Sequence, residues 1–207
     1  MNDFSPSEVI KKKPLIFRII VFAIVALLLV GIVIFIINKQ TQQNKKASTT
    51  NTVVENYKKQ LPVLAQTVEK NISDPVAHKN YAVALYATGD VQKAYDQYQA
   101  AIKLNGSDPI LYNNLGNVAR DLSKFDEAIT AYQKAISLNS KTINSYVNLA
   151  NLYIFTLNKV DLGIEVYTNA LVKNPGNVDL QVQLAIAYEQ QSNFKEALTI
   201  YNSNLKE

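Results

Sequence analysis

Residues 112–139, YNNLGNVARDLSKFDEAITAYQKAISLN, contain two amphipathic segments separated by a short break at residues 122–124. In each segment, apolar or small residues recur at three- and four-residue spacing, which places them on one face of an α-helix. The first segment carries this pattern at Tyr112, Leu115, Gly116 and Ala119, and the second from Phe125 to Ile136. The stretch therefore predicts two helices that pack against each other as a hairpin.

The same pattern recurs over residues 74–207, which indicates a repeat architecture. Four tyrosines are separated by 34, 35 and 34 residues: Tyr98, Tyr132, Tyr167 and Tyr201. Two series of small residues keep nearly the same period: Ala82, Gly116, Ala150 and Ala185, and Ala94, Ala128, Gly163 and Ala197. The third unit has one extra residue between Ala150 and Gly163, and we expect it in the turn at residues 156–159.

Local signals mark the ends of the predicted helices. Asp74-Pro75 and Asp108-Pro109 each provide an N-cap acceptor followed by proline at the first helical position. Gly89 and several Asn-rich segments are suited to ending helices. No alternating strand pattern occurs in the sequence, so the predicted fold class is all-α.

With period and residue type in agreement, the units resemble tetratricopeptide repeats (TPRs). The resemblance implies an α-solenoid of four hairpins over residues 74–207, with a concave face lined by the first helix of each unit. His78 and Gln181 stand where the family has a large aromatic, and Gly163 replaces a helix-favouring Ala. Residues 53–73 align with the second helix of a preceding unit, so we predict a capping helix or half-repeat there, with Pro62 starting or kinking it.

In the family, the concave face binds extended peptides or a partner's helix. Amide side chains recur on the predicted first helices and can both donate to and accept from a peptide backbone. The predicted groove residues are Lys79, Asn80, Asn114, Asn117, Arg120, Asn148, Asn151 and Gln183. The alternative is that these amides are ordinary polar surface. Val83 replaces one Asn of the known carboxylate clamp, so that particular ligand class is not expected.

Residues further along the first helices could add selectivity or could pack between hairpins: Tyr86, Arg120, Ile154, Phe155 and Glu189. For aromatic residues at helical spacing, packing is the favoured interpretation. His78 is expected to be an interface side chain, because no second His and no Cys accompany it.

Residues 19–37 form an uninterrupted run without a charged or strongly polar side chain, long enough as a helix to span about 28 Å. A cleaved signal peptide would have a shorter apolar region and a small-residue cleavage site. We therefore predict a retained single-pass transmembrane helix in contact with the lipid bilayer. It follows a short basic tail at residues 1–18.

Residues 38–52 contain one apolar side chain, Ala47, and are predicted to be a polar, flexible linker. Four basic residues precede the apolar run and three follow it closely: Lys11, Lys12, Lys13 and Arg18, then Lys39, Lys45 and Lys46. This bias favours a cytoplasmic N-terminus and extracytoplasmic repeats.

Composition excludes several functions. Residues 74–207 carry 11 basic and 13 acidic residues, so a nucleic-acid surface is not expected. The chain has no Cys and one His, and its six glycines form no phosphate-binding loop, so we expect no enzyme, cofactor, metal or small-molecule substrate. The predicted function is a membrane-tethered scaffold for polypeptide partners, possible settings being envelope assembly, secretion or holding of translocated chains. The alternative is a structural subunit of a fixed membrane complex.

Overall fold

The computed structural model describes the backbone of residues 15–204 and the side chains of residues 35–36, 38–42 and 49–204. Over this described part, every regular element is a helix and no strand is present, which confirms the all-α prediction. The chain divides into two compact units, Met1–Val53 and Val54–Glu207. Each unit is considered by itself below.

Helix α1 extends over Leu15–Lys70 and contains the backbone of residues 19–37. The side chains of residues 19–34 and Ile37 lie outside the described residues, as does most of the predicted basic tail, residues 1–14. The transmembrane helix therefore stays a prediction. In the part of the chain that is described, no helix combines the length and apolar character needed to cross a membrane.

The backbone of residues 38–52 is helical, so the prediction of a flexible linker is wrong at the level of secondary structure. Few apolar residues rule out a packed core but not a helix. Gln, Lys and Ala favour helical backbone, and continuing an existing helix requires no new nucleation. Pro62 also lies inside α1, so it does not start a separate helix. Directly before it, Leu61 packs against the core formed by the first hairpins.

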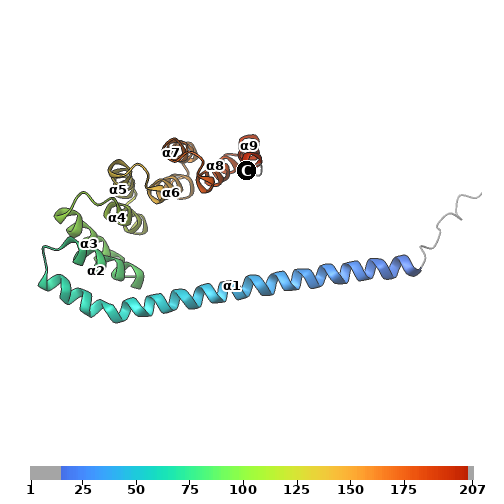
Figure 1. The fold of residues 1–207 in the computed structure, drawn as a ribbon, viewed down its shortest axis with the longest axis horizontal. Helices are drawn as coiled ribbons and strands as arrows, with labels where there is room; N and C mark the ends of the chain where they lie inside the picture. Colours follow the sequence, from blue (N-terminus) through green and yellow to red (C-terminus); the bar gives the residue numbers. More distant parts are fainter. Residues whose placement is uncertain (1–14, 205–207) are drawn as a thin grey trace, which may run out of the picture. The chain divides into compact units, whose positions relative to one another are not determined.

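Four helical hairpins follow α1 in sequence order (Figure 1). They pair α2 (Pro75–Thr88) with α3 (Val91–Leu104), α4 (Pro109–Asp121) with α5 (Phe125–Leu138), α6 (Ile143–Asn151) and η2 (Leu152–Thr156) with α7 (Val160–Lys173), and α8 (Val178–Gln190) with α9 (Phe194–Asn204). The second helix of each of the first three hairpins contacts the first helix of the next. First helices also contact one another, α4 with α6 and α6 with α8.

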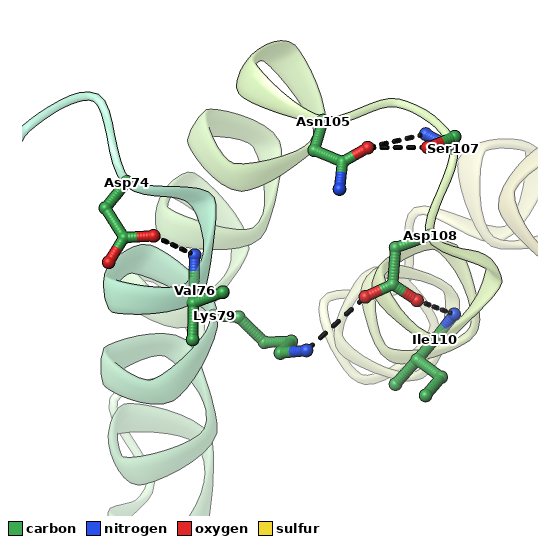
Figure 2. Close-up of polar contacts among 7 residues, drawn as sticks. All are labelled: Asp74, Val76, Lys79, Asn105, Ser107, Asp108 and Ile110. Carbon is green, nitrogen blue, oxygen red and sulfur yellow. Dashed lines mark hydrogen bonds and ion pairs between the residues drawn. The ribbon is translucent and has the colours of Figure 1, made fainter.

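The first helices of the first two hairpins begin as their sequences predict. Asp74 Oδ1 accepts a hydrogen bond from the Val76 N–H at 2.8 Å, and Asp108 Oδ1 accepts one from the Ile110 N–H at 2.8 Å (Figure 2). Each cap satisfies one of the N–H groups that have no partner inside the helix. Side-chain capping thus sets the start of these helices locally.

The turn inside every hairpin uses a residue with left-handed backbone conformation at the equivalent position. These four residues are Gly89 (φ 93°), Ser123 (φ 60°), Asn158 (φ 52°) and Ser192 (φ 62°). After this residue, the next N–H bonds back to a carbonyl of the first helix, as from Lys124 to Ala119 at 2.8 Å. This is the helix-ending pattern in which the left-handed residue reverses the chain. All four turns therefore have a left-handed residue at the same repeat position.

The extra residue of the third unit lies in the helix before the turn and not in the turn, contrary to the predicted position. Lys159 N–H bonds to the Tyr153 carbonyl at 2.7 Å across six residues, whereas the same bond spans five residues in the other units. The Leu157 N–H reaches the Leu152 carbonyl at 3.0 Å, which is an i→i+5 bond of a π-helix. The π-helical segment η2 absorbs the insertion.

Small residues allow the two helices of a hairpin to approach closely. A Cβ atom on Gly116 would lie 2.5 Å from a ring carbon of Tyr132, which is fully buried. A Cβ on Gly163 would overlap the side chain of Ile154, which η2 directs into the core. Glycine at 163 in place of the family's Ala is therefore matched to the π-helix that faces it.

Candidate peptide-binding surface

The amide row, defined as Asn80, Asn114, Asn148 and Gln183, occupies one position on each of the four first helices. Asn80 is exposed and the other three are half-buried. Their helices α4, α6 and α8 are in contact in that order. The members of the row on α4, α6 and α8 therefore lie on neighbouring helices, and the groove itself stays a prediction.

Asn113, which the repeat pattern did not single out, joins two members of the amide row. Its Oδ1 accepts hydrogen bonds from Asn148 Nδ2 and from the buried Ser145 Oγ, both at 3.1 Å. Its Nδ2 donates to Asn114 Oδ1 at 3.4 Å. Lys79 and Val147 occupy the equivalent positions in neighbouring units, so no periodic signal could have revealed this network.

Asn117 and Asn151 each form a hydrogen bond within their own hairpin. Asn117 Oδ1 accepts a hydrogen bond from the Tyr132 hydroxyl at 2.8 Å, and Asn151 Oδ1 accepts one from Tyr167 at 2.8 Å. Burial raises the pKa of Tyr167 to about 12, so its hydroxyl stays protonated and donates. These amides satisfy a buried hydroxyl, and their Nδ2 groups stay unused by the described residues.

The two predicted cations are paired within the chain. Lys79 Nζ lies 3.4 Å from Asp108 Oδ2 and links α2 to the start of α4 (Figure 2). Arg120 Nη2 lies 2.8 Å from Asp121 Oδ1. The other Asp121 oxygen accepts from the Tyr86 hydroxyl at 2.5 Å, and burial followed by this hydrogen bond raises the pKa of Tyr86 to about 12. Both cations thus neutralise neighbouring carboxylates.

The residues predicted to add selectivity separate into two groups. Ile154 is buried and packs at Gly163, whereas Phe155, beside it in η2, is 59% exposed.

His78 is buried, with Nε2 at 2.9 Å from the Ile72 carbonyl and Nδ1 at 2.7 Å from Gln97 Oε1. These contacts give His78 a packing role between α2, α3 and the turn that follows α1. Among the described residues, no His, Cys, Asp and Glu cluster is suited to hold a metal ion.

Comparison with protein families identifies the repeats. Tetratricopeptide repeat models match residues 109–141 and 147–205, and a TPR repeat model matches residues 83–120. This chain is a tetratricopeptide-repeat protein. No curated protein sequence matches it.

Solved TPR structures share the fold. The crystal structure of MamA has a TM-score of 0.65 at 19% identity and covers 73% of this chain and 88% of MamA. MamA residues 41 to the end from Desulfovibrio magneticus RS-1 give 0.63 at 17% identity, covering 78% and 94%. YrrB, described as a TPR protein with an unusual peptide-binding site, gives 0.56 at 18% identity, covering 73% and 77%. At these identities the similarity shows the fold alone.

Proposed function

We propose that this TPR protein is a membrane-tethered scaffold that binds a segment of a partner polypeptide along its first helices. The observation that carries the proposal is that the amides on this surface are only half used. Asn148 donates through Nδ2 and keeps its Oδ1, whereas Asn117 and Asn151 accept through Oδ1 and keep their Nδ2. A peptide backbone offers both donors and acceptors and can pair with such a surface. The activity is binding, without chemistry.

The description of YrrB as a peptide-binding TPR protein supports the same class of ligand. Internal pairing of Lys79 and Arg120 argues against a ligand selected by its negative charge. The preferred ligand is therefore an extended backbone with few acidic groups. Exposed Phe155 provides an apolar contact next to the surface.

Position-resolved photocrosslinking of the intact protein in its native membrane tests this surface. A photoreactive amino acid at Asn80 or Gln183 should capture a polypeptide, whereas the same group at exposed Thr199 on α9 should not. The variant Asn80→Ala/Asn148→Ala should lower the capture at Gln183 while leaving the far-UV circular dichroism unchanged. Equal capture at all three positions, or none at the first helices, would contradict the proposal.

A fixed structural subunit would behave differently in the same cells. Its partner would be crosslinked in constant proportion, and the chain would be degraded when that partner is deleted. A scaffold that binds transiently stays at normal abundance. Measuring the amount of this chain after deletion of the captured partner therefore separates the two functions.

Tethering rests on the uncharged run at residues 19–37 and on the basic residues that flank it. The proposed orientation places the N-terminus in the cytoplasm and the repeats outside. Alkaline carbonate should leave the protein in the membrane pellet. Protease added outside sealed cells should degrade the repeats, and degradation only from the inside would reverse the orientation.

A further inference from the structure

Two grooves lie between second helices, away from the amide row. The α3–α5 groove and the α5–α7 groove each enclose about 430 Å³. Their floors come from α4 and α6, respectively. No member of the amide row lines either groove.

The two grooves are built from the same repeat positions. Seven lining residues of the α3–α5 groove have equivalents in the α5–α7 groove at the repeat spacing, among them the pairs Gln99 and Gln133, Tyr112 and Tyr146, and Leu115 and Leu149. Ala131 and Val166 correspond in the same way on the second helices. A concavity that recurs in register along a repeat stack offers regularly spaced contacts to one extended ligand.

Both grooves combine an apolar floor with tyrosines and carboxylates. The α3–α5 groove contains Tyr95 and Tyr112 beside Asp126 and Glu127, and Lys134 is the one cation among its described lining residues. The α5–α7 groove contains Tyr146 and Tyr153 beside Glu165, with no cation among its described lining residues. Anionic groups next to aromatic faces form a favourable environment for a positive charge.

The chain itself places a cation in this environment. Lys124 Nζ lies 4.1 Å from the centre of the Tyr95 ring and 3.6 Å from Glu127 Oε1. Glu127 also accepts a hydrogen bond from the Tyr95 hydroxyl. The exposed carboxylates of Asp126 and Glu165, by contrast, pair with no cation among the described residues. They are available to a ligand.

We propose that the α3–α5 and α5–α7 grooves bind a basic segment of a partner polypeptide. Arg or Lys side chains stack on the half-buried Tyr112 and Tyr153 and pair with Asp126 and Glu165, while aliphatic side chains between them contact Leu115 and Ile136. The two grooves lie on either side of α5, so they are at least one helix diameter, about 10 Å, apart, which about three or four residues of extended chain span. This second surface goes beyond the proposed function, which uses the opposite helices of each hairpin.

The test measures fluorescence anisotropy with the full chain in detergent micelles. The probe is a labelled peptide with two Arg-Leu pairs about three residues apart, and a second peptide replaces both Arg by Glu. The Arg-Leu peptide should bind, more weakly as salt rises, and the Glu peptide should not. Two lost surface ion pairs correspond to about fivefold weaker binding for the variant Asp126→Asn/Glu165→Gln.

Two matched variants decide where the peptide binds. Glu69→Gln/Asp179→Asn removes the same charge from exposed positions outside the grooves and should leave the affinity unchanged. Asn80→Ala/Asn148→Ala alters the first-helix surface and should also leave the affinity for the Arg-Leu peptide unchanged. A failure of the proposed first-helix function can therefore be told apart from a failure of this second surface. Equal binding by the Asp126→Asn/Glu165→Gln variant and the wild type would overturn the inference. Equal weakening by Glu69→Gln/Asp179→Asn would do so as well.

Discussion

The α4–α5 hairpin and the α6–η2–α7 hairpin are two versions of one repeat, with and without an added residue. Both keep the left-handed turn residue and the tyrosine-to-asparagine hydrogen bond between their helices. They differ before the turn, where η2 replaces the end of a regular α-helix and places Phe155 in solvent. The comparison shows that a stack of hairpins accommodates an insertion when the turn and the core contacts keep their register.

The largest expected effect comes from deleting one residue in each hairpin. Without Phe155 the third unit returns to the regular spacing, and we expect a loss below about 1.5 kcal/mol. Deleting Asp121, the last residue of α4, rotates the turn that follows by about 100° relative to α4 and should cost more than about 4 kcal/mol. Urea unfolding followed by far-UV circular dichroism measures both. Equal losses in the two hairpins would show that η2 is not the site of the insertion.

The contact between Gly163 and Ile154 should give the next largest effect. Gly163→Ala forces a Cβ against the Ile154 side chain and should lower the free energy of unfolding by about 1–3 kcal/mol. In an Ile154→Ala background the same change should cost less, because the cavity receives the new methyl group. Additive losses in this double-mutant cycle would contradict a direct steric contact.

The tyrosine-to-asparagine hydrogen bond that each of the two hairpins contains should contribute the same free energy of unfolding in both. Tyr132→Phe and Tyr167→Phe each leave an asparagine oxygen without its donor and should cost about 1 kcal/mol. Tyr153→Phe is the control, since the Tyr153 hydroxyl makes no hydrogen bond within the described residues. Thermal unfolding of the three variants compares them. A loss in only one hairpin would mean that the insertion also changes the interior.

The turn residues should give the smallest effect, and one of opposite sign. Non-glycine residues in the left-handed region carry roughly 1 kcal/mol of strain, offset in part by the greater flexibility of unfolded glycine, so Ser123→Gly should stabilise by about 0.5–1 kcal/mol. Asn158→Gly should gain less, because Asn tolerates this conformation. Gly89→Ala, measured by the same urea titration, should destabilise. A stabilised Gly89→Ala variant would argue against a common turn.

Much of the hairpin architecture could be predicted because it depends on local patterns. Helical periodicity and the caps at Asp74 and Asp108 act within a few residues, and the tyrosine series repeats in step with the stack. The candidate surface was less accessible to prediction. Asn148 bonds to Asn113 across 35 positions and Asn117 to Tyr132 across 15, and neither pairing follows from residue type or spacing. The helical backbone over residues 38–52 was missed because polar composition does not distinguish an extended helix from an irregular chain.

The sequence by itself determined that four hairpins follow one another with a period near 34 residues, and that the third contains one extra residue between Ala150 and Gly163. Only the tertiary structure decided that this residue enters a π-helix. The hydrogen bonds that close the turn and the packing of Ile154 at Gly163 hold both sides of the insertion in place, which leaves η2 to absorb it. The structure likewise decided which amides hold the stack together and which atoms remain for a partner, since hydrogen-bond partners are set by the distance between helices.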